Sequence, residues 1–474
     1  MSCSSSERPP TLPGANCPFP GIAIHTRKGD IPPMRIKQPL LTAWFVIITL
    51  STVPVYADSS SAATIGNPSA PAAPLTLDTF LALVRRENPV LTAARSGIDV
   101  ARGWRSQARL LPNPTLEVEV GDMATDRFGD LGESVNTFLL SQEFVTADKR
   151  RAMTAIADTE VTISSLEYEV LEREMLTHGR QAFFTLLAAQ ERVAAFERLL
   201  DIARRGAEAS RHRVEAGDAS PVDTVRAGVA LSQAVIGHRH AGAAAANANV
   251  ALQQLTGCSD GALPQIGSAT TLYELPSEAE SEASLLAALE QHPAARALQA
   301  AVSLAAGELT LARKERWPNI EAGFGIESVP DENDGRDESF VIELSLPLPV
   351  FDRNQGAIAA AKSAYRQAEL QYRAGRVQLT TQLRQALRNY VAARQSTETY
   401  RSEVVPGAQR AFDLVKRSYE AGEINQLELL DAQQSLIEAE LAYIDNLADL
   451  RQAQAELQGL TFTTAGNGTT QRSE

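Results

Sequence analysis

Four segments of the chain alternate apolar and polar residues with a period of two, which is typical of strands with two unlike faces. These segments lie at about 115–120, 134–144, 319–327 and 339–347. In the first of them, Leu116, Val118 and Val120 share one face, and Glu117 and Glu119 share the other. Because a tilted strand of about 9–11 residues crosses a bilayer, we expect these strands to lie in a membrane.

Stretches without proline follow the strand pairs and predict very long helices. Residues 149–215 contain no proline and two glycines, and at about 1.5 Å per residue such a helix reaches roughly 100 Å. Residues 354–420 repeat the pattern, but Pro406 should kink or interrupt that helix. Two shorter helices, at about 90–111 and 222–255, together nearly match the long one and would stack end to end beside it.

Apolar residues of the last helical segment recur every three or four positions, as in the seam of a coiled coil. They are Leu430, Ile437, Leu441, Ile444 and Leu447. Aromatic residues make up 5 % of the chain and alanine-rich tracts are frequent, which suits close helix packing better than a large globular core. The helices are therefore expected to pack as long antiparallel coiled coils.

The same order of features occurs twice along the chain. The matched pairs are Pro89 and Pro293, Pro114 and Pro318, and Asp148 and Asp352 at a spacing of 204, and Gly217 and Gly422, and Leu252 and Leu457 at 205. This register predicts two copies of one structural unit, far longer than the repeats of solenoid proteins. We place the copies at 76–257 and 285–462, with a polar inter-repeat insertion at 258–284 that is expected to lie outside the bundle.

The region before the first copy has the features of an export signal, with a basic start, a short apolar run and a small-residue cleavage site before Asp58. We interpret Met34 as the initiator, because signal peptides begin at the start of a chain. The remaining boundaries are a mis-assigned extension at 1–33, the signal peptide at 34–57, a flexible linker at 58–75 and a disordered tail at 463–474. The mature chain is thus expected to be exported.

Composition and motifs exclude several functions. The net charge of −14 argues against nucleic-acid binding, which needs a basic surface. His238 and His240 are two residues apart and would not face together on a helix, and no other residues form a metal-site pattern. The chain also lacks a nucleophile–base group and a phosphate-binding loop. The sequence therefore predicts neither an enzyme nor a bound cofactor or metal.

Four strands are too few for a closed membrane barrel, because the smallest have about eight. An open strand edge in lipid leaves backbone amides unpaired, at a cost of several kcal/mol each. Three chains would supply about twelve strands, enough for a pore with a wet interior. The predicted fold is therefore mainly α with a transmembrane β part, in which each chain is internally duplicated and adds four strands to a 12-stranded trimeric barrel above an α-barrel tunnel.

The string LSLPLPVFDRNQG, Leu344–Gly356, resembles the CzcC-like heavy-metal cation branch of the TolC-like outer-membrane efflux proteins, and the resemblance covers about 76–462. It implies a homotrimer in the lipid of the outer membrane of a Gram-negative bacterium, with a long periplasmic portion. It also implies two partners, a periplasmic adaptor and an inner-membrane resistance–nodulation–division (RND) pump. The implied function is a passive conduit that exports heavy-metal cations from the periplasm or cytoplasm to the exterior.

The resemblance places the periplasmic gate at Glu428 and Asp431, just after the second helical turn. Three copies of each would form an acidic ring that attracts cations, and repulsion between like charges would favour opening. The alternative is that both are ordinary polar helix positions. The first copy has Asp223 and Arg226 at the matching places, and Arg226 would tether one of the gate carboxylates across the closed end.

The two helical turns resemble the tips that contact the adaptor in this family. Their residues are Gly217, Asp218, Ala219 and Ser220 in the first copy, and Gly422, Glu423, Ile424 and Asn425 in the second. Glycine is expected there because it adopts the left-handed conformation that ends a helix; the alternative is two plain turns without a partner. Asp352 is expected to cap the start of the second long helix.

Two other functions remain open at the level of sequence. The same conduit would serve drugs or type I protein secretion if the branch is assigned wrongly, because the string that defines the branch lies at a strand-to-helix transition. A different class is an exported coiled-coil scaffold without a pore. The four alternating strands at matched places in both copies argue against the scaffold.

Overall fold

The computed structural model describes residues 75–121, 134–217, 220–257, 270–331 and 335–461. All of them belong to one compact unit, Ala70–Glu474. The predicted extension, signal peptide and C-terminal tail, and all of the predicted linker except Leu75, lie outside the described residues. Within the described residues, none of the helices combines the length and the apolar character that a membrane span requires.

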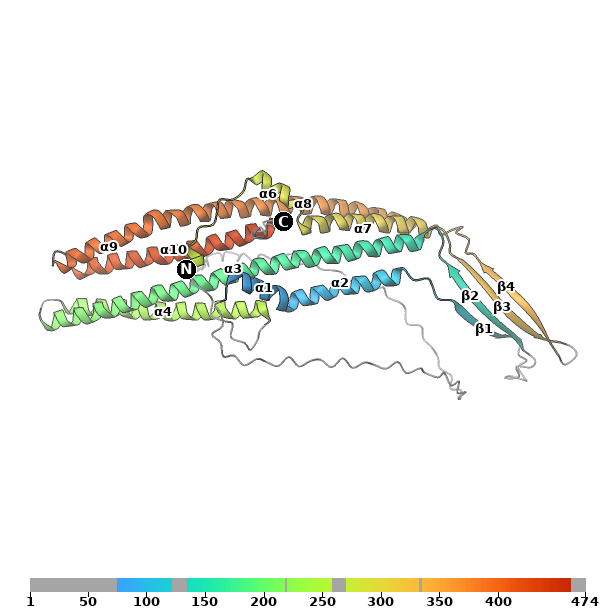
Figure 1. Ribbon diagram of the computed structural model, residues 1–474, viewed down its shortest axis with the longest axis horizontal. Coiled ribbons are helices and arrows are strands. Elements are labelled where there is room, and N and C mark those ends of the chain that lie inside the picture. The colour runs from blue at the N-terminus through green and yellow to red at the C-terminus, as the bar shows by residue number, and fades with distance from the viewer. Residues whose placement is uncertain (1–74, 122–133, 218–219, 258–269, 332–334, 462–474) are drawn as a thin grey trace, which may run out of the picture. The chain divides into compact units, whose positions relative to one another are not determined.

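The long helix α3, Lys149–Glu215, has the predicted bounds and lies at the centre of the first half of the chain. Helices α2, Pro89–Ala108, and α4, Pro221–Thr256, pack along it one after the other (Figure 1). At their junction the Asn88 Nδ2 donates to the Leu255 carbonyl at 2.8 Å. The predicted end-to-end stacking of the two shorter helices is therefore confirmed. Helix α1, Leu77–Glu87, packs on α3 beside this junction.

The second half has a related arrangement. Helices α7, Pro293–Glu315, and α10, Gln426–Leu460, both pack along α8, Gln355–Thr399. A five-residue π-helix, Tyr400–Val404, separates α8 from α9, Val405–Glu420. Pro406 stands in the first turn of α9, which confirms the predicted interruption: proline has no N–H to donate, and its ring disturbs the preceding turn.

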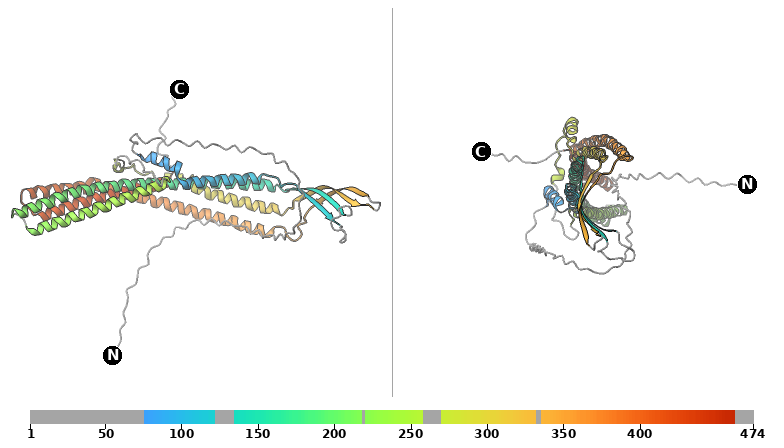
Figure 2. Two further views of the ribbon diagram at one scale, coloured as in Figure 1. Left: turned by 90° about the horizontal axis from the view of Figure 1, so that it is seen from below. Right: turned by 90° about the vertical axis from the view of Figure 1, so that its right-hand side faces the viewer.

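The strands form one antiparallel sheet in the order β1-β2-β3-β4, which extends from the ends of α2, α3, α7 and α8 (Figures 1 and 2). Their bounds are Thr115–Gly121, Val135–Phe144, Ile320–Pro330 and Arg336–Ser345. The central pairing, β2 with β3, joins the two halves of the chain. The outer strands β1 and β4 each pair on one side only, so the sheet of one chain is open at both edges.

The core lies where α1, α3 and α10 meet. Phe80 and Val84 of α1 are fully buried against Phe183 and Leu187 of α3 and Leu447 of α10. Full burial of each such side chain contributes about 1.5–3 kcal/mol relative to exposure. A second cluster joins α6, Glu282–Leu289, to α8 and α10. The coiled-coil seam predicted for α10 is confirmed in the middle of that helix, where Ile437, Ile444 and Leu447 are buried.

Two local expectations are wrong. The described part of the insertion, 270–284, was expected outside the bundle but packs onto it. Helix α5, Thr270–Tyr273, buries Leu272 completely, and Arg451 donates to the carbonyl of Glu274. The cap of α8 is Asn354 with φ 60°, not Asp352. Asp352, two residues before this cap, instead accepts a hydrogen bond from the Asn354 N–H at 2.8 Å.

Candidate functional site

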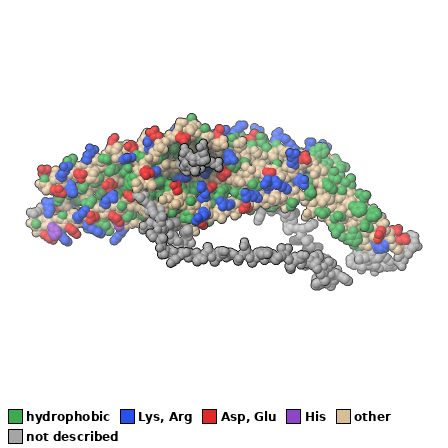
Figure 3. Space-filling model, viewed as in Figure 1, with side chains coloured by type: hydrophobic (Ala, Val, Ile, Leu, Met, Phe, Trp, Pro, Cys, Tyr) green, Lys and Arg blue, Asp and Glu red, His purple; other side chains and the backbone are tan. Residues whose placement is uncertain are grey.

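The sheet has one continuous apolar face that is exposed to its surroundings. Cross-strand pairs such as Leu140 with Phe324 and Ile326 with Phe340 carry this face across all four strands. Phe340 and Ile342 are 77 % and 82 % exposed, although they are among the most apolar side chains of the chain. Figure 3 shows the resulting hydrophobic surface at the end of the molecule that the sheet forms. A patch of this extent marks contact with lipid or protein rather than with water.

The opposite face of the same sheet is hydrophilic. Glu117, Glu119, Glu321, Glu327 and Glu343 alternate with the apolar residues, as the period-two pattern predicts. Ser141 donates to Glu321 at 2.7 Å across the strands. This face therefore suits contact with water and cations, while the other suits lipid.

Leu139 is an apolar residue on the hydrophilic face, and it is buried because two glycines face it. Its side chain covers Gly323 and Gly325, where an added Cβ would lie 3.1 Å from the Leu139 Cδ1. A side chain at Gly325 would also collide with the Phe138 carbonyl oxygen. The glycines of β3 are thus required by close packing between the strands.

At the other end of the long helices, the chain reverses at Gly217 and Gly422, which have φ of 83° and 77°. This left-handed conformation favours glycine, and at the second turn the Glu423 N–H reaches back to the Ser418 carbonyl at 2.9 Å. Ser220 and Asn425 then cap the following helices, α4 and α10. Among the other predicted tip residues, Glu423 is exposed and Ile424 is half-buried, while Asp218 and Ala219 lie outside the described residues.

Glu428 and Asp431 both lie exposed in the first turns of α10. The Glu428 N–H donates to Asn425 Oδ1 at 3.1 Å, and Asn425 Nδ2 donates to Glu428 Oε1 at 3.3 Å. In α4, Asp223 occupies the matching place and accepts from the Ser220 N–H at 3.3 Å. Glu428 therefore has a local role at the helix start, where a negative charge is favourable, whereas Asp431 has no such capping contact among the described residues.

A contact that the sequence did not reveal joins the two helical hairpins near the turns. Arg213 of α3 donates to the Tyr419 hydroxyl of α9 at 2.7 Å, and its guanidinium lies 5.4 Å from the centre of the Tyr419 ring. The tether predicted for Arg226 has no counterpart among the ion pairs of the described residues. Arg213 and Tyr419 are each close to a turn glycine, but they do not match each other in the 205-residue register, so no repeat pattern pointed to them.

A metal site requires several ligating side chains close together in space. Within the described part of the chain, no three His, Cys, Asp or Glu side chains gather closely enough to hold a metal ion. His178 and His292 line one cavity of about 270 Å³ between α3, α7 and α10. There His292 is already used, because its Nδ1 accepts from the Ala294 N–H at 3.2 Å and its Nε2 lies 3.3 Å from the Gly459 carbonyl oxygen.

Comparison with known proteins relates this arrangement to membrane channels. The model of the outer membrane efflux protein family matches residues 81–258 and again 285–461. The cobalt-zinc-cadmium resistance protein CzcC of Cupriavidus metallidurans is 32 % identical over 387 residues, which are 81 % of this chain and 90 % of that protein. Protein CyaE of Bordetella pertussis is 25 % identical over 350 residues, 71 % of this chain and 73 % of that protein.

Solved structures agree on the fold. A crystal structure of CusC, in a study of its folding and transmembrane channel formation, superposes with a TM-score of 0.68 at 17 % identity, over 81 % of this chain and 92 % of that one. At this identity the likeness shows the fold alone. The family model covers most of the chain, and the match to CzcC spans nearly the whole length of CzcC. The resemblance inferred from the sequence is therefore confirmed. The chain belongs to the outer membrane efflux protein family, and within that family it is similar to CzcC.

Proposed function

We propose that this protein is the outer-membrane channel of a tripartite efflux system and a passive conduit for heavy-metal cations. The observation that carries the proposal is the sheet with one exposed apolar face and one acidic face, open at both edges. In lipid an open edge costs several kcal/mol for each unpaired amide. Pairing of β1 with β4 of a neighbouring chain removes both edges, and three chains complete a ring of about twelve strands.

Several features support the rest of this architecture. The described elements follow the same order in both halves, and the family model matches twice, which supports an internal duplication. The long helices, continued from three sheets, would form a tunnel across much of the periplasm. The turns at Gly217 and Gly422 would contact a periplasmic adaptor, which in turn binds an inner-membrane RND pump. A conduit of this kind needs no catalytic group, because the pump supplies the energy.

The cation substrate is supported by chemistry and by similarity. Glutamates on the hydrophilic sheet face would attract cations in the pore. CzcC, at 32 % identity, is named for resistance to cobalt, zinc and cadmium. At the closed end of the tunnel we place Glu428 and Asp431, three copies of which would form an acidic ring. The i, i+3 spacing puts both on one side of α10.

Growth and conductance together test this function. A strain without the gene should become sensitive to zinc, cobalt or cadmium, and should accumulate the metal, while its sensitivity to drugs stays unchanged. The purified protein should form cation-selective channels in planar bilayers. Drug sensitivity without a metal effect would overturn the choice of substrate, and a protein that neither fractionates with the outer membrane nor conducts would overturn the channel itself.

The acidic ring is tested by the double variant Glu428→Gln and Asp431→Asn. We expect the cation-to-anion permeability ratio to fall several-fold, because the like-charged ring is gone. The matched control is Glu438→Gln with Asp449→Asn, two exposed carboxylates farther along the same helix. An unchanged permeability ratio in the first variant would show that the two carboxylates form no selective ring, and that Glu428 acts only with the cap residue Asn425 at the start of α10.

A further inference from the structure

Basic residues are concentrated where the helices meet the sheet. The ten residues that adjoin each strand on the helix side, at 105–114, 145–154, 310–319 and 346–355, together carry nine Lys or Arg and three Asp or Glu. The whole chain has the opposite balance, with 44 basic and 58 acidic residues. Figure 3 shows Lys and Arg side chains on the helices beside the apolar sheet surface, on the same side of the molecule. These four segments therefore form a basic belt at the level where the helices join the sheet.

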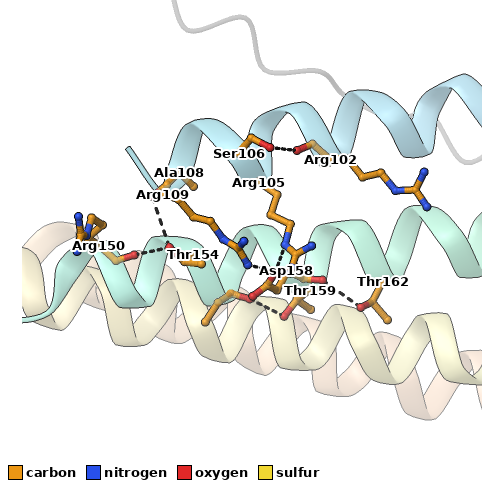
Figure 4. Close-up of polar contacts among 11 residues, drawn as sticks. Arg102, Arg105, Ser106, Ala108, Arg109, Arg150, Thr154, Asp158, Thr159 and Thr162 are labelled. Atoms are coloured by element: carbon orange, nitrogen blue, oxygen red, sulfur yellow. Dashed lines mark hydrogen bonds and ion pairs between the residues drawn. The ribbon is translucent and has the colours of Figure 1, made fainter. Parts of the chain in front are cut away.

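Within the belt, one cluster has more positive charge than its own carboxylate can balance. Arg105 of α2 and Arg109, the C-cap of α2, both reach Asp158 of α3, and the Arg109 Nη2 lies 3.7 Å from the Asp158 Oδ1 (Figure 4). Arg150 and Arg151, in the first turn of α3, line the same cavity of about 480 Å³ as Arg109 and Asp158. Two guanidinium groups thus contact the Asp158 carboxylate, and two more line the cavity beside it. The described residues offer no ion-pair partner to Arg150 or Arg151.

The height of this cluster relative to the sheet indicates what it would bind. Helix α3 begins five residues after the end of β2 at Phe144, and Asp158 is nine residues farther along. At about 1.5 Å per residue, the cluster lies within roughly 14 Å of the helix start. In the proposed channel the apolar sheet face occupies the hydrocarbon layer, so Arg150 and Arg151, close to the sheet, fall at the level of the lipid headgroups. Arg105 and Arg109 extend to Asp158 beside them.

We propose that Arg105, Arg109, Arg150 and Arg151 bind the phosphate of an anionic phospholipid headgroup in the inner leaflet of the outer membrane. Guanidinium groups bind phosphate oxygens through paired N–H donors, and a headgroup supplies the negative charge that Asp158 alone does not. The bound lipid would hold α2 against α3 beside the barrel. This inference rests on the proposed function, because the headgroup reaches the cluster only if the sheet is in the membrane.

The discriminating variant is Arg150→Gln with Arg151→Gln, since both side chains are exposed and leave the pairs with Asp158 intact. The chain supplies its own control, because Arg204 and Arg205 form the same dipeptide in the same helix, far from the sheet and also exposed. The control variant is Arg204→Gln with Arg205→Gln. It removes a surface pair of Arg205 with Asp201, which contributes little to stability.

The experiment is native mass spectrometry of the full protein taken from bicelles with equal amounts of phosphatidylglycerol and phosphatidylcholine. We expect the wild type and the control to retain phosphatidylglycerol preferentially, and the Arg150 and Arg151 variant to retain at least three-fold less of it. An unchanged lipid ratio in that variant would overturn the proposal. A second arm measures thermal stability in phosphatidylcholine with inorganic phosphate or chloride at equal ionic strength. Stabilisation by inorganic phosphate without preferential retention of phosphatidylglycerol would assign the cluster to a small anion. This result would also overturn the proposal.

Channel recordings on the same samples separate this inference from the proposed function. A variant that conducts normally but keeps the wild-type lipid ratio refutes the lipid site alone. A wild-type protein that fails to conduct in any bilayer refutes the channel, and the lipid site with it.

Discussion

Single polar residues fasten the junctions between stacked helices. Asn88 caps α2 by accepting from the N–H groups of Val90 and Leu91, and its Nδ2 reaches the end of α4. His292 stands at the matching place of the second half, where it caps α7 and its Nε2 meets the Gly459 carbonyl of α10. The acceptor atom of each side chain therefore binds N–H groups at the start of one helix, and its donor atom binds a carbonyl at the end of the other. A neutral histidine satisfies this only with the proton on Nε2.

This arrangement predicts a pH dependence of stability. Burial lowers the pKa of His292 below its ordinary value of 6.5, and the nearby Arg173 charge lowers it further, against the opposing contact with Gly459. The unfolded chain therefore binds a proton at His292 more readily than the folded one, so stability is full above about pH 6.5 and falls as the pH drops through the folded-state pKa. Protonation of Nδ1 would also remove the cap of α7.

The variant His292→Asn tests this, because asparagine serves the same junction at position 88 without titrating. We expect thermal unfolding to show a smaller loss of stability between pH 7.5 and pH 5.5 in the variant than in the wild type. The other histidines are present in both proteins, so the difference reports His292. Equal pH dependence in the two proteins would contradict this account.

At the scale of elements, the helix pairs approach closely where a glycine faces a large side chain. Gly237 of α4 lies against the Phe196 ring of α3, and a Cβ at this position would lie 2.7 Å from the ring Cδ1. Gly228, nine residues earlier in the same helix, has no neighbour within 4 Å of such a Cβ. The two positions have the same backbone conformation and differ in packing alone.

This pair predicts opposite effects of the same substitution. Gly237→Ala should destabilise the protein by about 1–3 kcal/mol, because the methyl group forces the Phe196 ring or the helix to move. Gly228→Ala should stabilise it by up to about 1 kcal/mol, since alanine is the better helix former. Chemical denaturation followed by the helical circular dichroism signal measures both. A stabilising Gly237→Ala would mean that α4 packs less closely on α3 than described.

Elements defined by periodic patterns could be predicted from the sequence, and those defined by contacts could not. The bounds of α3 follow from the absence of proline over residues 149–215 and the glycine after it. The alternating pattern predicts that the fourth strand begins at about residue 339, whereas β4 begins at Arg336. Arg336–Ser339 lies in an acidic segment without alternation, yet its backbone pairs with the end of β3. The cap at Asn354 depends on the Ala312 carbonyl of another helix, to which its Nδ2 donates at 2.8 Å. No local pattern carries that information.

The candidate site divides in the same way. The two faces of the sheet follow from alternation, and the turn glycines follow from the conformation that a helix end requires. The pairing of Arg213 with Tyr419 joins residues 206 positions apart, and the clustering of Arg105, Arg109 and Arg150 needs α2 packed on α3. Both appear only when the helices are placed side by side.

At the scale of the whole molecule, the two halves meet along α3, which packs on both α7 and α10, and again at a side-chain contact near the turns. There the Arg213 side chain of one hairpin binds Tyr419 of the other, both by a hydrogen bond and over the ring. In the proposed channel the turns lie at the closed periplasmic end. We propose that opening separates the hairpins at this level, so that a contact between them favours the closed state.

Removal of this contact should therefore favour the open channel. We expect Arg213→Met to raise the mean conductance in planar bilayers by several-fold, and Tyr419→Phe to raise it less, because the ring and its contact with the guanidinium remain while the hydrogen bond is lost. The matched control is Arg211→Met, since Arg211 pairs with Glu215 of its own helix at 3.8 Å and has no ion pair with the second hairpin among the described residues. The order Arg213→Met above Tyr419→Phe above control assigns the closed state to the Arg213 contact. An equal rise in conductance in Arg213→Met and Arg211→Met would show that the charge of the tip alone matters. The hairpins would then be held together elsewhere.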